Sequence, residues 1–255
     1  MNMISPALWA ALGTGFIFLM TLLGAAAVFF FSKEIHPRWQ NGILGLAGGV
    51  MTAAAVWSLL LPAIERSVSF PFPVWLPPAV GVGLGVALLM ALDALILRLA
   101  PEGLSGHPEK RQNLLLFTAI TLHNIPEGMA VGLAFALAGT GESLAAACIL
   151  ALGIGIQNSP EGAAISLPLR QSGCSRGRSF LAGALSGAVE PVFGMLAFFA
   201  AAGVSALMPW LLSFAAGAML YVVVEELVPQ AHSRSGTLGF LAGFLLMMVL
   251  DVALG

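Results

Sequence analysis

Uninterrupted apolar runs recur along the whole chain, and each is long enough to cross a lipid bilayer as a helix. Such a span needs about 20 mainly apolar residues. The runs are continuous rather than alternating, which favours helices over the strands of a membrane barrel. They lie at residues 7–31, 42–64, 74–97, 113–138, 143–169, 179–202, 206–229 and 237–254. The sequence therefore predicts an all-α integral membrane protein with eight transmembrane helices, folded as one domain over residues 1–255.

Charge is scarce in this chain. Only 9% of its 255 residues are charged, whereas soluble domains contain about 25%. The net charge is −2 and no long basic tract is present, so we expect no nucleic-acid partner. The first apolar run lacks a basic segment before it and is longer than the core of a signal peptide. We therefore interpret it as a retained span and expect a lipid bilayer as the surroundings.

The distribution of basic residues tests the number of spans. Nine of the ten Lys and Arg residues fall in the first, third, fifth and seventh loops, and only Arg66 falls in an even-numbered loop. Cytoplasmic loops carry an excess of Lys and Arg. This bias predicts that the odd-numbered loops face the cytoplasm and that both termini lie outside it.

Three carboxylates are predicted near the centres of spans: Glu127 in the fourth, Glu161 in the fifth and Glu190 in the sixth. An ionised group at the bilayer centre costs about 2.5–3.5 kcal/mol on insertion scales. No Lys or Arg lies near these span centres to neutralise them. Protonation, hydrogen bonding, water or a cation must therefore compensate the buried charge.

The residues around two of these carboxylates favour the cation. The fourth span contains HNIPEG, in which His123 and Asn124 precede Glu127 by four and three residues. The fifth contains QNSPEG, in which Gln157 and Asn158 hold the same spacing to Glu161. Residues three and four apart share one face of a helix. Imidazole nitrogen with amide and carboxylate oxygen suits a borderline divalent cation such as Zn²⁺.

Each motif also contains a proline. Pro126 and Pro160 lack the N–H that would bond four residues back, so we expect the helices to kink or break there. The carbonyls of Leu122 and Ile156 would then be freed at membrane depth. Discontinuous helices of this kind line the ion sites of many transporters.

The paired motifs within eight spans resemble the ZIP (Zrt/Irt-like) family of divalent-metal transporters, especially its bacterial GufA-like branch. The resemblance implies a 3+2+3 arrangement, with spans 1–3 and 6–8 as inverted repeats around spans 4 and 5. It also implies two adjacent metal positions bridged by the two motif glutamates. One position would use His123, Glu127, Gln157 and Glu161. The other would use Asn124, Glu127, Asn158, Glu161 and Glu190.

A metal pathway is indicated by further residues. The segment VEELVPQAH resembles the cytoplasmic exit segment of the family, in which Glu226 and His232 match and Glu225 stands where His is common. Glu65 and Asp93, near the ends of the second and third spans, are candidate entrance and exit residues, and for each a solvated surface position is an equal alternative. The resemblance further implies a homodimer in the bacterial inner (cytoplasmic) membrane.

Together these features predict a transporter that moves Zn²⁺, and related cations such as Fe²⁺, Mn²⁺ and Cd²⁺, toward the cytoplasm. Zn²⁺ would be the transported substrate, and no cofactor is expected. The alternative is an intramembrane metal-dependent hydrolase using the same ligands, but the chain lacks an H-E-x-x-H motif and a nucleophile–base pair. A haem-binding subunit would need paired mid-span histidines, and only His123 is so placed. We therefore expect a protein that is not an enzyme.

Overall fold

Every regular element that the structure describes is a helix. The structure is a computed structural model, and it describes residues 5–30, 37–99, 108–141, 143–203 and 205–254. Five helical stretches in this part of the chain are long and apolar enough to cross a membrane. They are Pro6–Phe30, Asn41–Ser67, Arg176–Ala201, Met208–Gln230 and Arg234–Ala253. The prediction of an all-helical chain with membrane-spanning helices is thus confirmed.

The helices follow one another along the chain with short connections. In order they are α1 (Pro6–Ala25), α2 (Ala27–Phe30), α3 (Pro37–Ala54), η1 (Ala55–Leu60), α4 (Leu61–Ser67), α5 (Leu76–Leu99), α6 (Pro108–Ala138), α7 (Leu144–Gln171), α8 (Arg176–Gly187), α9 (Val189–Gly203), η3 (Ser205–Leu207), α10 (Met208–Val222), η4 (Val223–Leu227), α11 (Val228–Gln230) and α12 (Arg234–Leu254). Ser5, Ser143 and Ser175 cap the N-termini of α1, α7 and α8, because each hydroxyl accepts a hydrogen bond from a backbone N–H of the first turn.

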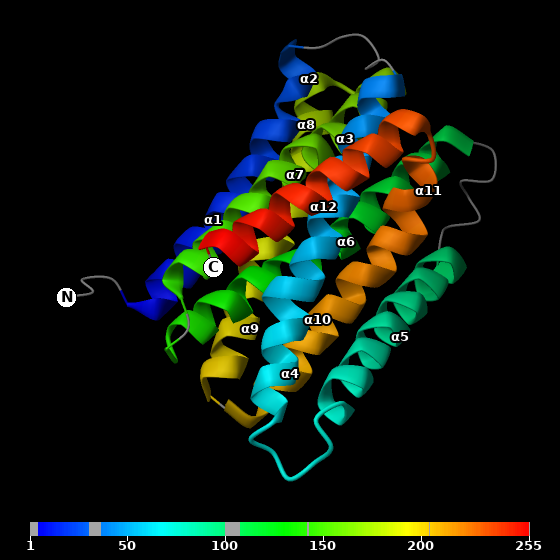
Figure 1. Ribbon diagram of the computed structural model, residues 1–255. Helices are drawn as coiled ribbons and strands as arrows, with labels where there is room; N and C mark the ends of the chain where they lie inside the picture. Colours follow the sequence, from blue (N-terminus) through cyan, green and yellow to red (C-terminus); the bar gives the residue numbers. More distant parts are fainter. Residues whose placement is uncertain (1–4, 31–36, 100–107, 142, 204, 255) are drawn as a thin grey trace.

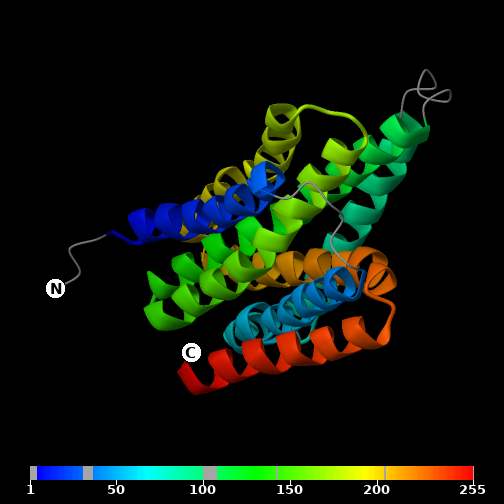
Figure 2. The same ribbon diagram turned by 90° about the horizontal axis from the view of Figure 1, so that it is seen from above.

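The long helices form two groups that lie side by side (Figures 1 and 2). In the first group α1 packs along α7, and α6 packs along α9, with further contacts from α1 to both α6 and α9. In the second group α3 packs along α12, and α5 packs along α10. Contacts of α10 with α6 and of α3 with α7 join the two groups.

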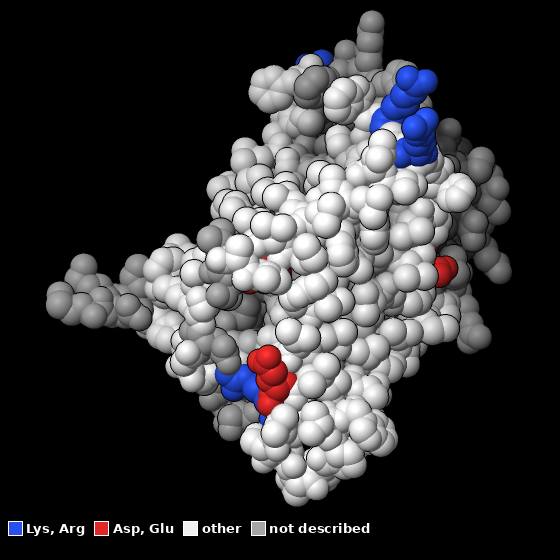
Figure 3. All heavy atoms as spheres, in the orientation of Figure 1, with Lys and Arg blue, Asp and Glu red and all other residues white. Residues whose placement is uncertain are grey.

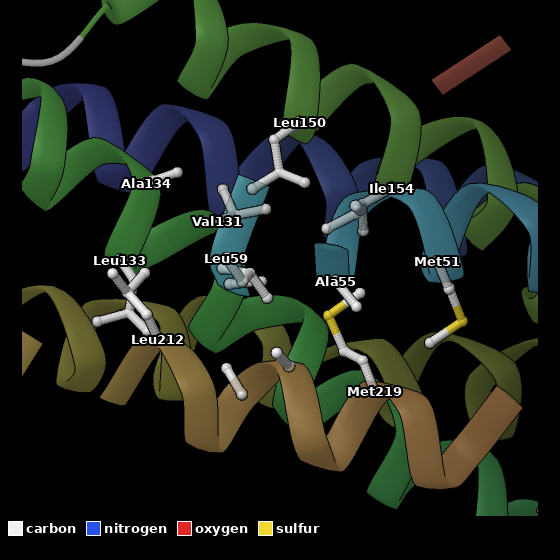
Figure 4. Close-up of a cluster of buried hydrophobic side chains, with 14 of the residues drawn as sticks. Met51, Ala55, Leu59, Val131, Leu133, Ala134, Leu150, Ile154, Leu212 and Met219 are labelled. Carbon is white, nitrogen blue, oxygen red and sulfur yellow. The ribbon is translucent and has the colours of Figure 1, made fainter. Parts of the chain in front are cut away.

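The interface between the two groups is apolar. Figure 4 shows Met51, Ala55 and Leu59 of α3 and η1 facing side chains of α6, α7 and α10, among them Leu150 and Met219. These side chains belong to one continuous buried core. The core therefore fills the contact between the helix groups with apolar side chains. The buried polar residues of the two motifs in α6 and α7 are not part of it.

Charged side chains gather at the two ends of the helix bundle, and the broad surface between them is mostly uncharged (Figure 3). The described arginines at one end lie at the start of α3, the end of α7, the start of α8 and the start of α12. Arg66, near the end of α4, lies at the other end. Many Leu, Val and Phe side chains on the surface between the ends are exposed, as expected for a surface that faces lipid.

The prolines of the two motifs do not interrupt their helices. Pro126 lies inside the continuous helix α6, and Pro160 lies inside the continuous helix α7. Of the two expected effects, a kink or a break, the break does not occur. A proline removes only one backbone hydrogen bond, and helices packed on both sides can hold the flanking turns in helical conformation. The irregular turns occur elsewhere, in the π-helices η1 and η4.

Candidate metal site

Six polar residues of the two motifs and of α9 are buried inside the first helix group. Asn124 and Glu127 come from α6, Gln157, Asn158 and Glu161 from α7, and Glu190 from α9. Five of them have no exposed surface and Glu161 is 4% exposed. The spacing of three and four residues within each motif places the donors of one helix on the face that meets the other helix. This placement agrees with the prediction that the acidic side chains of the three spans lie inside the protein rather than facing lipid.

Two hydrogen bonds donated by the amide groups of the motifs hold parts of this polar cluster. Nε2 of Gln157 donates to Oε1 of Glu127 over 2.6 Å, which joins α7 to α6. Nδ2 of Asn124 donates to the backbone carbonyl of Ser186 over 2.9 Å, which joins α6 to α8. Each bond uses the amide nitrogen of its donor. The amide oxygens of Gln157 and Asn124 are consequently left free to accept or to coordinate.

Several other side-chain polar atoms of this cluster have no hydrogen-bond partner. Among the described residues, most of the buried side-chain polar atoms without a hydrogen bond belong to this cluster. They are Asn124 Oδ1, Glu127 Oε2, Gln157 Oε1, Asn158 Oδ1 and Nδ2, both carboxylate oxygens of Glu161, and Glu190 Oε2. A buried polar atom left unsatisfied costs about 1–3 kcal/mol. Such a concentration of unsatisfied acceptors in one place calls for a bound cation, water or protons.

The three carboxylates repel one another electrostatically. Glu127 interacts with the charges of both Glu161 and Glu190. The side chain of Asn158 lies beside the carboxylates of Glu127 and Glu190, although neither of its polar atoms forms a well-directed hydrogen bond. The described basic side chains lie at helix ends rather than beside these carboxylates. Positive charge from outside the protein is therefore the natural counterpart of the cluster.

The described side chains hold no group of three or more His, Cys, Asp and Glu residues that could bind a metal by themselves. The side chain of His123, a predicted ligand, lies outside the described residues. The cluster combines carboxylates with amides, and both groups offer oxygen atoms to a metal. Oxygen ligands from amides and carboxylates suit hard and borderline divalent cations.

Glycines bring the helix backbones into contact around the cluster. A Cβ atom on Gly128 would meet the backbone of Glu190, and one on Gly132 would meet the backbone of Gly194. In the same way, Gly162 abuts the backbone of Thr21. Gly128 and Gly162 therefore each allow the backbone of a third helix to approach the residues beside the motif glutamate.

Sequence reasoning missed one polar contact of this cluster. Thr21 of α1 is fully buried, and its Oγ1 donates to Oε1 of Glu190 over 2.8 Å. A threonine in an apolar run is usually satisfied by the carbonyl of its own preceding turn, so its type gives no signal. The two residues are 169 positions apart, and only the packing of α1 against α9 brings them together.

The predicted pathway residues lie apart from this buried cluster. Glu65 is exposed near the end of α4, and Glu225 is exposed in η4. Glu226 accepts a hydrogen bond from Nε2 of Gln230 over 3.1 Å. His232 is exposed and lines a surface pocket of about 300 Å³ between α3, α11 and α12. The side chain of Asp93 lies outside the described residues.

Comparison with known proteins decides the family. Residues 102–251 match the family model described as ZIP zinc transporter. The chain belongs to the ZIP family. Both glutamate motifs, Glu190 and the η4 segment fall within the matched residues of this ZIP protein.

Relatives of this ZIP protein cover nearly its whole length. It is 40% identical to the zinc transporter GufA of Myxococcus xanthus, over 92% of this chain and 94% of that protein. It is 38% identical to the zinc transporter ZIP11 of Homo sapiens, over 96% and 97% of the two chains. It is also 38% identical to the zinc transporter ZIPB of Bordetella bronchiseptica, over 97% and 82%. These proteins are named as transporters and not as enzymes, so the hydrolase alternative finds no support.

Proposed function

We propose that this ZIP protein transports divalent metal cations, with Zn²⁺ as a substrate, through the polar cluster of α6, α7 and α9. The observation that carries the proposal is the set of buried, unpartnered carboxylate and amide oxygens in the interior of the first helix group. The names of the relatives, all zinc transporters, point to the same substrate. Fe²⁺, Mn²⁺ and Cd²⁺ have related donor preferences and are proposed as further substrates.

The cation compensates what the protein alone leaves unsatisfied. Glu127, Glu161 and Glu190 each have at least one buried oxygen without a partner, and isolated charge inside a membrane is expensive. A doubly positive ion attracts all three carboxylates, and this attraction offsets the repulsion among them. Protons compete for the same oxygens, because carboxylates have to be deprotonated to bind metal. Metal occupancy is thus reversible, as transport requires.

Two adjacent metal positions are proposed within the cluster. The first uses His123, Glu127, Gln157 and Glu161. The second uses Asn124, Glu127, Asn158, Glu161 and Glu190. The unpartnered amide oxygens of Gln157 and Asn124 support a ligand role for both side chains, since their nitrogens are already engaged. In this proposal Glu127 and Glu161 bridge the two positions.

The eight-span topology and the 3+2+3 repeat are also proposals, and helix packing supports them. If the first three spans correspond in order to the last three, and the fourth to the fifth, then the contact of α1 with α7 corresponds to that of α9 with α6. The contact of α3 with α12 likewise corresponds to that of α10 with α5. Both pairs of contacts occur. The second and seventh spans also each contain a π-helix, η1 and η4.

The charge distribution supports a proposed orientation of the protein in the membrane. Most described arginines lie at one end of the bundle, and this end faces the cytoplasm under the positive-inside rule. Both termini then lie outside the cytoplasm. We propose that metal enters from the opposite end, binds at the cluster and leaves toward the cytoplasm across a bacterial inner membrane. Glu225, Glu226 and His232, near the arginine-rich end, are candidates for the exit.

A homodimer is the proposed assembly. The many exposed apolar side chains leave ample surface for a second copy within the bilayer, and small residues favour close packing of membrane helices.

Uptake into proteoliposomes tests the function. We expect Glu127→Ala to reduce Zn²⁺ uptake to near background, because it removes the carboxylate shared by both metal positions. Leu238→Ala, at an exposed position of α12, is the comparison and should leave uptake near the wild-type rate. Incorporation of each variant is checked by its amount in the vesicles and by its thermal unfolding. Zn²⁺ uptake at the wild-type rate by inserted Glu127→Ala would overturn the proposal.

A further inference from the structure

The side chain of Thr21 connects helix α1 to the polar cluster through a hydrogen bond to Glu190. Its hydroxyl lies 2.8 Å from Oε1 of Glu190, and both side chains are completely buried. The second oxygen of the same carboxylate, Oε2, has no hydrogen-bond partner. One oxygen of Glu190 is thus engaged by the protein, and the other is left available.

We propose that Thr21 is a positioning residue of the metal site, which fixes Glu190 so that it coordinates through Oε2 alone. The inference rests on the proposed function, because it assigns a role to Thr21 only if a cation binds at the cluster. It also extends the site to α1, which supplies none of the ligands proposed above.

The packing of α1 fixes where this hydroxyl points. A Cβ atom on Gly187 would contact the Cβ and Cγ2 atoms of Thr21, and one on Gly162 would meet its backbone carbonyl. Helices α7 and α8 therefore enclose Thr21 from two sides. A β-branched side chain has few χ1 conformers in a helix, so an enclosed threonine has little freedom to turn away from Glu190.

The hydroxyl proton has two possible acceptors. Oγ1 lies 3.3 Å from the carbonyl oxygen of Ile17 in its own helix and 2.8 Å from Oε1 of Glu190. A hydroxyl donates only one proton, and a hydrogen bond to a charged acceptor is shorter and stronger. The proton is therefore directed to the carboxylate when Glu190 is ionised, which is the form that binds metal.

A hydrogen bond of this kind orients a ligand. Partners of metal-binding carboxylates fix their orientation, and removing one typically costs about 10–100-fold in metal affinity. With the hydroxyl absent, Glu190 is free to rotate and to present both oxygens. Bidentate coordination suits larger ions held at longer distances. Loss of the Thr21 hydroxyl should therefore weaken Zn²⁺ binding more than Cd²⁺ binding.

Thr14 provides a matched control on the same helix. It is also completely buried, and its hydroxyl donates within α1, to the carbonyl of Ala10 over 2.8 Å with that of Ala11 at 3.3 Å. Thr14→Val and Thr21→Val therefore remove the same group from equally buried positions. Only the second change removes a contact with Glu190.

The test measures Zn²⁺ and Cd²⁺ binding to the purified full-length protein by calorimetry, with uptake half-saturation and maximal rate measured in vesicles. We expect Thr21→Val to weaken Zn²⁺ binding about 10–100-fold, to raise half-saturation more than it lowers the maximal rate, and to increase the preference for Cd²⁺. Thr21→Ser keeps the hydroxyl and should restore most of the affinity. Thr14→Val should bind both metals as the wild type does.

Three results would overturn the inference. One is wild-type Zn²⁺ binding by Thr21→Val, the second is an equal loss in Thr14→Val, and the third is a failure of Thr21→Ser to restore binding.

Glu127→Ala separates these results from failure of the proposed function. If Glu127→Ala loses Zn²⁺ binding while Thr21→Val keeps it, the role of Thr21 is wrong and the function stands. If both bind Zn²⁺ as the wild type does, the proposed site itself is wrong.

Discussion

The amide nitrogen of Gln157 donates to the carboxylate of Glu127 over 2.6 Å, across the contact between α7 and α6. This bond connects the first residue of one motif to the glutamate of the other. It leaves Oε1 of Gln157 without a partner in a fully buried position. The two motifs thus form one polar unit rather than two separate interruptions of apolar helices.

Replacing Gln157 by histidine should change the preference among metals. The change exchanges an amide oxygen for an imidazole nitrogen, which favours Zn²⁺ over harder cations such as Mn²⁺. We expect Gln157→His to increase the ratio of Zn²⁺ to Mn²⁺ uptake when both ions are present. Gln171→His, at the exposed end of the same helix α7, is the control and should leave the ratio unchanged. An unaltered ratio in Gln157→His would count against Gln157 as a ligand.

Acid should weaken transport by competition. Protons and metal ions bind the same carboxylate oxygens, and metal requires the deprotonated form. Lowering the pH should therefore raise the Zn²⁺ concentration needed for half-maximal uptake, and saturating Zn²⁺ should restore much of the rate. Vesicles with equal pH on both sides separate this competition from any effect of a proton gradient. A half-saturation concentration that stays constant over the acidic range would contradict the prediction.

The contact of Gly132 with Gly194 should tolerate no side chain. A Cβ atom on Gly132 would meet the backbone of Gly194, so Gly132→Ala has to push α6 and α9 apart. Overpacking of this kind typically costs about 1–3 kcal/mol. We expect a lower unfolding temperature together with reduced Zn²⁺ uptake. Gly83→Ala, where a Cβ atom has no neighbour within 4 Å, should unfold at or above the wild-type temperature.

A second carboxylate contact, which is partly buried, lies outside the polar cluster. Oγ of Ser58 in η1 donates to Oδ1 of Asp251 in α12 over 2.9 Å. Ser58→Ala should lower stability, by about 1–3 kcal/mol if the carboxylate finds no new partner. In a chain that already carries Asp251→Leu, the same change should cost much less. Thermal unfolding of the two single variants and the double variant measures this coupling, and additive effects would show that the bond contributes nothing.

The sequence predicts the buried polar cluster well because its members repeat at helical spacing within apolar runs. Asn124, Glu127 and the three polar residues of the second motif stand out for this reason alone. Glu190 stands out by its depth in an apolar run. Their burial confirms that part of the interpretation. Their roles as ligands stay a prediction.

Other features leave no local trace in the sequence. Thr21 and Glu190 are far apart in the sequence and meet only because the helices pack together. The residues near either position therefore do not predict the hydrogen bond. Pro126 and Pro160 predict a kink or a break, and neither helix breaks; neighbouring helices can hold the turns around a proline in helical conformation. The π-helices at Ala55–Leu60 and Val223–Leu227 each end two residues before a proline. Proline alone does not predict such a turn, because Pro126 and Pro160 stand in α-helix. Helix ends extend beyond the apolar runs, as in α6, which begins at Pro108 rather than at residue 113.

The π-helix η1 acts as a one-residue insertion within an otherwise α-helical rod. Each residue of an α-helix turns the chain by about 100°, so the insertion sets the azimuth at which Leu61–Ser67 meets its neighbours. Deleting one residue of η1 would shorten the helix and would also rotate Glu65 and Arg66 to a different side of it. When related chains are aligned here, a misplaced single-residue gap would therefore equate residues that lie about 100° apart around the helix.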